Sequence, residues 1–283
     1  MPYLLAGAFL ISFSSVFVKL ADVGPTAALF YRFLFGFLAL TAGVLWLRAV
    51  VWVGWRSWVW AAAAGIAFSL DLFFWHRSIH FVGPGVATIL ANLQVFGLAV
   101  IGIVFMGERL TWRLAVAVPM SVVGLLMIIG TDWSSLGQDY RLGVVFGLLT
   151  AVCYTSVTLL LRKCRTLPKS LPPVSIMAWV CLIGATAGGV EVAAGEEVFR
   201  VPDLMSWVIL IVYGAVCSGL AWALITKGLP LVDASRAGLI MVLQPTLAFV
   251  WDILIFARPT TLVHALGAAI TLGAIYLGTA RES

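Results

Sequence analysis

The stretch "LDLFFWHRSIH", residues 70–80, places an acid, a guanidinium and two imidazoles at the end of a long apolar run. From residue 58 to residue 69 the chain is almost entirely Ala, Gly, Ile, Phe, Trp and Val. Residues 58–79 supply the length of about 20 mostly apolar residues that a helix needs to cross a bilayer. An ionised group at the bilayer centre costs at least about 2.5–3.5 kcal/mol, so Asp71 and its neighbours should not face lipid. The stretch therefore predicts a membrane-spanning helix inside a bundle, with protein or water on both of its polar faces.

The composition of the whole chain favours the same environment. Of its 283 residues, 63% are hydrophobic and only 10% are charged, and the mean hydropathy is +1.10. An average soluble domain has about 25% charged residues, so a polytopic membrane protein is predicted. The net charge of +5 lies in loops between apolar spans and does not indicate a nucleic-acid partner. The four cysteines show no CxxC spacing and predict packing residues rather than disulfides or a metal cluster.

Ten apolar spans fit the chain, which predicts an all-α membrane protein with ten transmembrane helices. The first 20 residues lack a basic region and a cleavage site, and we expect them to form a retained first helix rather than a signal peptide. The expected spans are 3–20, 26–47, 58–79, 85–106, 112–130, 142–161, 173–193, 204–226, 234–256 and 261–279. With both termini in the cytoplasm, eleven of the 17 Lys and Arg residues fall on the cytoplasmic side, as the positive-inside rule favours.

The two halves of the chain resemble each other. "ATILANLQVFGLAVIGIVF" (87–105) aligns without a gap with "AGLIMVLQPTLAFVWDILI" (237–255), so that Gln94 coincides with Gln244. Arg77 likewise falls opposite Lys227. Five spans in each half is an odd number, so the second copy would enter the membrane upside down. We predict two inverted five-helix repeats, 3–130 and 142–279, with a binding site near the midplane between them.

Several stretches resemble the EamA-type proteins of the drug/metabolite transporter superfamily. They are "SFSSVFVKLADVGPTAALFYRF", "WHRSIHFVGPGVATILANLQVFGLAVIGIVFMGERLT", "GLLTAVCYTSVTLLLRK" and "LITKGLPLVDASRAGLIMVLQPTLAFVWDILI". The resemblance implies a secondary carrier of the bacterial inner membrane, often an exporter, for which amino acids are a common substrate class. Two family features are kept in one half only: Gly107-Glu108 has "FARPTT" opposite it, and Pro245 has Val95 opposite it. These departures weaken any conclusion drawn from perfect repeat symmetry.

Charged residues gather in the predicted outer half of the bundle. They suggest an ionic gate between spans 1, 2, 3 and 9, since opposite charges in a low-dielectric site attract strongly. The alternative is static pairing that only neutralises these groups, and Arg32 is the residue that best fits that alternative. The proposed gating or ion-pair residues are Lys19, Arg32, Asp71, Arg77, Asp252 and Arg258.

Amides and aromatic side chains inside the spans are the candidate substrate-binding residues. Amides this deep must be satisfied by protein, water or a ligand, and helix–helix bonding is the alternative to substrate binding. His76 could carry a proton near neutral pH, or could simply bond a neighbour. Asp71 and Trp75 share one helix face, while His76 and His80 share another. The candidate residues are Trp75, His76, Asn92, Gln94, Tyr154, Trp179, Trp222 and Gln244.

These features favour a transporter of a neutral or aromatic amino acid that works by alternating access, with or without proton coupling. A midplane cluster of Arg and Lys, which a phosphate-bearing substrate would need, is not seen in the sequence. Other metabolites or drugs, such as nucleobases or vitamins, remain open. A membrane-embedded enzyme using Asp71, His76 and His80, or an accessory subunit without transport, are alternatives of another class. We expect no catalytic residues, cofactor or metal, because a third ligand for the two histidines is not evident. The oligomeric state is not indicated.

Overall fold

The protein is described here by a computed structural model that is helical throughout the parts it describes. These are residues 2–94, 96–97, 100–101, 112–129, 137–195, 198–228, 243–257 and 259–279, and no strand occurs within them. Helices suit a membrane span because each satisfies its own backbone hydrogen bonds away from water. The elements are α1 (Pro2–Ser12), α2 (Ser14–Leu20), α3 (Pro25–Leu47), α4 (Trp55–Val82), α5 (Pro84–Ala91), α7 (Trp112–Ile129), α8 (Gln138–Thr166), α9 (Pro173–Ala194), α10 (Leu204–Val212), the π-helix η1 (Tyr213–Ala221), α11 (Trp222–Gly228), α13 (Leu243–Phe256) and α14 (Leu262–Thr279).

Six stretches of the described chain are long and apolar enough to cross a membrane, and three apolar helices are shorter. The six are Pro2–Leu20, Pro25–Trp46, Trp55–Val82, Gln138–Arg165, Pro173–Ala194 and Leu204–Ile225. Parts of the expected spans 85–106 and 234–256, including residues 102–106 and 234–242, lie outside the described residues, as do parts of the aligned pair 87–105 and 237–255. An integral membrane protein is therefore supported, while the count of ten spans and the inverted repeat stay predictions.

Proline and glycine set several helix boundaries. Pro25, Pro84 and Pro173 each stand at the start of a helix, where the missing N–H costs nothing. Gly83 joins α4 to α5 with φ +86°, a backbone conformation that residues with a Cβ atom rarely adopt. Pro119 lies inside α7, which continues through it.

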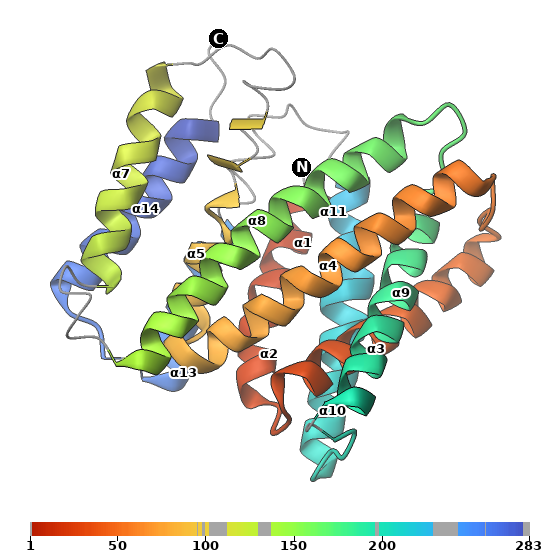
Figure 1. Ribbon diagram of the computed structural model, residues 1–283, viewed down its shortest axis with the longest axis horizontal. Helices are drawn as coiled ribbons and strands as arrows, with labels where there is room; N and C mark the ends of the chain where they lie inside the picture. The colour runs from red at the N-terminus through yellow and green to blue at the C-terminus, as the bar shows by residue number, and fades with distance from the viewer. Residues whose placement is uncertain are drawn as a thin grey trace.

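The helix α4 buries Asp71, Trp75 and His76 against its neighbours, while Ile66 and Leu70 on another face are exposed. It runs antiparallel to α8 along most of its length and also packs against α9, α3 and α5 (Figure 1). The other main pairs are α3 with α9 and η1, α5 with α13, and α7 with α14. On α9, a Cβ at Gly184 would lie 2.5 Å from Phe33, so the contact with α3 requires glycine there.

Three apolar helical segments are interrupted near the middle of the bundle. The first breaks at Phe13, between α1 and α2, and α5 ends at Ala91 before the non-helical Asn92. The segment from Leu204 to Gly228 passes through the nine-residue π-helix η1. Interrupted helices and π-helical turns are frequent where a protein exposes backbone and side chains to a ligand.

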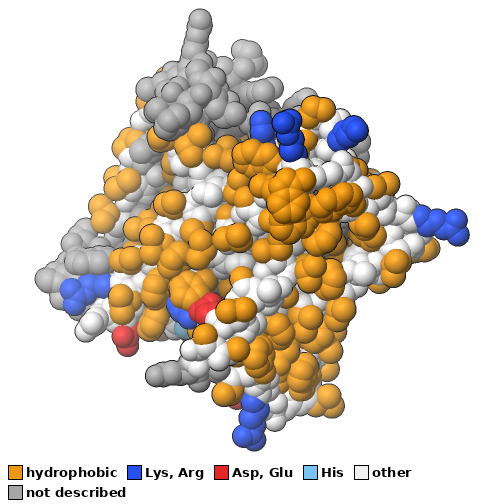
Figure 2. Space-filling model, turned by 45° about the vertical axis from the view of Figure 1, so that its right-hand side comes forward, with side chains coloured by type: hydrophobic (Ala, Val, Ile, Leu, Met, Phe, Trp, Pro, Cys, Tyr) orange, Lys and Arg blue, Asp and Glu red, His pale blue; other side chains and the backbone are white. Residues whose placement is uncertain are grey.

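The surface is apolar, as contact with lipid requires. Figure 2 shows hydrophobic side chains over most of one face, with most Lys and Arg side chains toward its edges. Exposed tryptophans include Trp46, Trp52, Trp55 and Trp112, which the sequence suggests lie near one membrane interface. All four cysteines are described, and none forms a disulfide.

Candidate functional site

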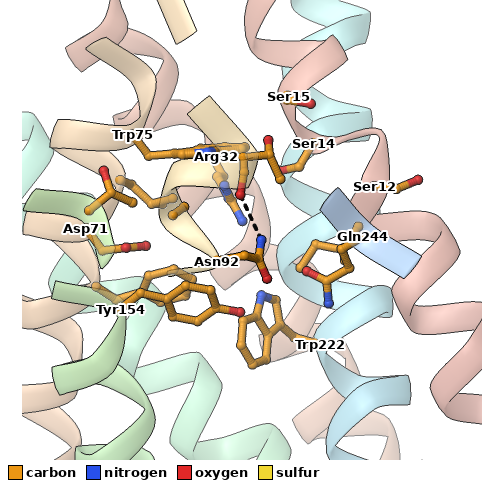
Figure 3. Close-up of a pocket in the computed structure, with 16 residues that line it drawn as sticks. Ser12, Ser14, Ser15, Arg32, Asp71, Trp75, Asn92, Tyr154, Trp222 and Gln244 are labelled. Atoms are coloured by element: carbon orange, nitrogen blue, oxygen red, sulfur yellow. Dashed lines mark hydrogen bonds between the residues drawn. The ribbon is translucent and has the colours of Figure 1, made fainter. Parts of the chain in front are cut away.

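A small cavity of about 60 Å³ lies where the interrupted helices meet. Drug-sized ligands occupy pockets of roughly 300–1,000 Å³, so this cavity would have to widen to admit a metabolite. Its lining mixes aromatic, hydroxyl, amide and charged side chains (Figure 3). The lining residues are Ile11, Ser12, Ser14, Ser15, Arg32, Phe68, Asp71, Leu72, Trp75, Thr88, Ala91, Asn92, Thr150, Tyr154, Trp222 and Gln244.

Buried polar atoms without a hydrogen-bond partner concentrate at this cavity. Among the described residues, Asp71 Oδ1, Ser15 Oγ and Trp222 Nε1 are buried and unpartnered, and all three residues line it. A buried polar group left unsatisfied costs roughly 1–3 kcal/mol, more if charged, and calls for an explanation. A ligand or water in the cavity would satisfy these atoms.

The Arg32 side chain is held by neutral groups. It is only 2% exposed, yet its Nε donates to Ser218 Oγ at 3.1 Å and its Nη1 donates to Tyr213 Oη at 2.7 Å. Its guanidinium also lies over the rings of Tyr213, Trp75 and Phe68, at 4.8, 5.7 and 5.8 Å from their centroids. Both hydrogen-bond acceptors come from η1, so the π-helix positions the cation.

Asp71 places a carboxyl group on the cavity wall. It comes from α4, is 4% exposed and lies within electrostatic reach of Arg32, but no ion pair within 4.0 Å joins the two. In Figure 3 the Asp71 carboxylate and the Arg32 guanidinium point into the same space, beside the Tyr154 hydroxyl and the Trp222 indole. The cavity therefore lies between a buried guanidinium group and a buried carboxyl group.

A chain of hydrogen bonds behind Arg32 fixes its orientation. His76 Nε2 lies 2.9 Å from Tyr213 Oη and His76 Nδ1 lies 3.0 Å from the Pro25 carbonyl oxygen. The carbonyl can only accept, so Nδ1 carries a hydrogen. In the neutral tautomer with that hydrogen, His76 Nε2 accepts from the Tyr213 hydroxyl, whose oxygen in turn accepts from Arg32. His76 is fully buried and supports Tyr213 rather than lining the cavity.

The structure brings five of the eight predicted substrate-binding residues to the cavity: Trp75, Asn92, Tyr154, Trp222 and Gln244. The other three are His76, Gln94 and Trp179, and each has a different neighbourhood. Gln94 Oε1 accepts from Thr158 Oγ1 at 3.2 Å, which joins it to α8. Trp179 Nε1 donates to the Val51 carbonyl at 2.9 Å and thereby ties α9 to the loop before α4. These two side chains make the helix–helix and packing contacts that were the alternatives to substrate binding.

Within the described part of the chain, the predicted gating charges contact several different partners. Arg77 pairs with Glu191 of α9 at 3.1 Å, and its Nη2 also donates to Thr26 Oγ1 at 3.0 Å. Asp252 Oδ2 accepts from the Gly85 N–H at 3.0 Å, at the start of α5.

Lys19 is exposed, Arg32 and Asp71 line the cavity, and Arg258 lies outside the described residues. An outer ionic gate thus stays a prediction for another conformation.

Several residues of the site were not anticipated from the sequence. Tyr213 and Ser218 hold Arg32 from more than 180 positions away, and Glu191 is the partner of Arg77. Ser15 was also missed, although the sequence near it holds a clue. The "SFSS" stretch (12–15) places small hydroxyl side chains where the first helical segment is interrupted. Within the described ranges, no group of three or more His, Cys, Asp and Glu side chains could hold a metal ion.

Comparisons with known proteins agree with this arrangement. A crystal structure of a protein superposes with a TM-score of 0.71 at 19% identity, covering 99% of this chain and 98% of that one, so the fold is shared. A protein of Archaeoglobus fulgidus named an uncharacterized transporter is 24% identical over 174 residues, which cover 62% of this chain and 59% of that protein's length. The model of the EamA-like transporter family matches residues 1–130 and again residues 141–279. The chain therefore belongs to the EamA-like transporter family of the drug/metabolite transporter superfamily.

Proposed function

We propose that the chain is a secondary transporter that moves a neutral or aromatic amino acid across the bacterial inner membrane, in the direction of export. The cavity at the interrupted helices carries this proposal, because it joins unpartnered polar groups with aromatic walls. Such a lining suits a small molecule with polar ends and an apolar part. The family membership supports transport of a small molecule through a lipid bilayer.

Alternating access is the mechanism that best fits the cavity. A cavity of about 60 Å³ must widen before a metabolite enters, and the helices around it must separate on one side at a time. Two observations support motion between related halves. The helices pair as α3 with α9, α5 with α13 and α7 with α14, which is the pattern that a two-fold relation would produce. The two stretches that match the family model divide the chain in the same way. We place both termini in the cytoplasm because the Lys and Arg distribution favours it.

Counterflow in proteoliposomes tests the proposal. The purified protein would be reconstituted with unlabelled amino acid inside, and labelled amino acid would be supplied outside across a panel of neutral and aromatic members. We expect uptake above that of empty liposomes, competed by a subset of the panel. A pH gradient across the same liposomes then shows whether protons are coupled. A folded protein that takes up no member of the panel would overturn the substrate assignment, and nucleobases, vitamins and cationic drugs would be tested next.

A further inference from the structure

We propose that the cavity recognises the two charged ends of a zwitterionic amino acid, with Arg32 binding the α-carboxylate and Asp71 binding the α-ammonium group. This inference rests on the proposed transport of amino acids and names the residues that select them. It reassigns both side chains from a gating role to substrate recognition. Three features of the cavity carry it: the donor left on Arg32, the acceptor left on Asp71, and the charge balance between them.

Arg32 has donors available for a carboxylate. Its Nε and one hydrogen of Nη1 are occupied by Ser218 and Tyr213, and Nη2 donates to no described residue. Ser218 and Tyr213 are neutral, and no acidic group of the described residues lies within ion-pair distance of this buried cation. A guanidinium matches a carboxylate with two parallel hydrogen bonds, and the pair is strongest where water is excluded. The two η1 hydroxyls hold the guanidinium in place before the ligand arrives, which reduces the entropy lost on binding.

Asp71 and Asn92 have acceptors available for an ammonium group. Asp71 Oδ1 is buried and unpartnered although it faces the cavity. Asn92 uses its Nδ2 to donate to the Thr88 carbonyl at 2.8 Å, which leaves its Oδ1 as an acceptor on the same wall. An ammonium group has three donors and needs several acceptors when it leaves water. Asp71, Asn92 and the unpartnered hydroxyl of Ser15 provide them.

The charge balance makes both ends of the ligand necessary. A zwitterion places one positive and one negative charge between Asp71 and Arg32, and each buried charge gains an opposite partner. An acid without the ammonium group would leave Asp71 buried beside a second negative charge. An amine or amide without the carboxylate would leave Arg32 uncompensated. Leaving one buried charge of a pair unpaired typically costs 2–5 kcal/mol, which corresponds to roughly 30-fold or more in affinity.

The test uses three compounds that differ only at their charged ends: phenylalanine, 3-phenylpropionate, which lacks the ammonium group, and phenylalaninamide, which lacks the carboxylate. Each would compete with labelled amino acid in the counterflow assay, and each would be tested for thermal stabilisation of the detergent-purified protein. If another amino acid is transported best, its own deaminated acid and amide replace these. For the wild-type protein we expect each single-charge analogue to bind about 100-fold more weakly than the zwitterion.

Two substitutions should change the ranking in opposite directions. Asp71→Asn should lower the affinity for phenylalanine and raise the affinity for 3-phenylpropionate relative to it. Arg32→Gln should lower the affinity for phenylalanine and raise the affinity for phenylalaninamide relative to it. A merely structural role would weaken all three compounds alike. Arg77→Gln is the matched control, because Arg77 lies outside the cavity, and it should keep the wild-type ranking. If Arg32→Gln fails to fold, the wild-type series and Asp71→Asn still decide the matter.

The two proposals can fail separately. If the wild-type protein transports amino acids but the amide or the deaminated acid competes as well as the zwitterion, the recognition by Arg32 and Asp71 is overturned and the transport function stands. If no amino acid is transported but phenylalanine alone among the three stabilises the protein, the transport proposal fails and the recognition stands. Equal stabilisation by all three compounds would overturn the recognition.

Discussion

Arg32 and Arg77 lie on neighbouring helices, α3 and α4, but their surroundings differ sharply. Arg77 is partly exposed, stacks over the Phe73 ring at 3.5 Å and forms an ion pair with Glu191 at 3.1 Å. Arg32 is almost fully buried, and its guanidinium donates to two hydroxyl groups and lies over aromatic rings. The first arrangement neutralises a charge near the end of a helix. The second leaves the guanidinium available to a further partner. Burying a charge without an ionic partner costs free energy, and such a cost is typical of positions where a ligand or a partner binds.

The largest expected effect tests whether the geometry of the guanidinium matters beyond its charge. Arg32→Lys keeps the charge, but one ammonium group does not reach Ser218, Tyr213 and the cavity in the fork arrangement of Arg32. We expect the initial counterflow rate to fall by about 10- to 100-fold. Arg77→Lys can still pair with Glu191 and should stay within a few-fold of wild type. Equal losses for the two variants would remove the distinction between the two arginines.

The next effect concerns the hydroxyl that joins Arg32 to His76. Tyr213→Phe leaves Nη1 of Arg32 and Nε2 of His76 without their shared partner, in a fully buried position. We expect a destabilisation of about 1–3 kcal/mol, measured as a lower thermal midpoint in detergent. Tyr140→Phe is the control, because the Tyr140 hydroxyl makes no hydrogen bond with the described residues. A wild-type midpoint for Tyr213→Phe would show that Arg32 is not held by η1.

A smaller effect is expected from the partner of Arg77. Glu191→Gln removes the charge of the ion pair while keeping an oxygen that can accept from Thr26. Because this pair is partly exposed, the loss should be at most about 1 kcal/mol. Thermal midpoints at low and high salt measure it, and salt should reduce the difference between the two proteins. A loss of stability as large as that of Tyr213→Phe would show that the Arg77–Glu191 ion pair contributes as much stability as the buried hydrogen bonds of Tyr213.

The smallest effect extends the comparison to a charge in full contact with water. Asp203 begins α10, and hydrogen bonds from the Ser206 N–H and hydroxyl lower the pKa of its carboxyl group. A lowered pKa in the folded state means that this stabilisation is present above the unfolded value of about 3.9 and is lost as pH falls through the folded value. Asp203→Asn should therefore lower the thermal midpoint slightly at pH 7, with the difference shrinking below about pH 4. A difference that grows in acid would contradict the assignment.

The helical spans and the burial of the polar residues of α4 could be predicted from the sequence, because both follow from local physics. Apolar length predicts a span, and the cost of charge in lipid predicts that Asp71 and Trp75 face protein or water. The face carrying these two residues lines the cavity, while His76 on the other face contacts Tyr213. Helical periodicity alone separates these two sets of side chains.

The partners of the charged residues could not be predicted in the same way. Glu191 and Arg77 are 114 positions apart, and Tyr213 and Arg32 are 181 apart, so the pairing depends on the packing of whole helices. The π-helix that aims two hydroxyls at Arg32 has no marked signal in "YGAVCSGLA". Charge alone suggested that oppositely charged residues would pair with each other, whereas the structure pairs Arg32 with hydroxyls and Asp252 with a backbone N–H.

The hydrogen bond from Gly85 to Asp252 has a consequence for motion. It joins the first turn of α5 to the C-terminal half of α13. The two helices lie so close there that a Cβ at Gly85 would be 2.8 Å from Phe249. Separating these helices would break this hydrogen bond and the close packing around it, so we expect α5 and α13 to move together. We therefore expect the hinge for the transport cycle to lie outside this contact. The break at Phe13 is the position we expect, because the Phe13 ring stacks on Trp251 of α13.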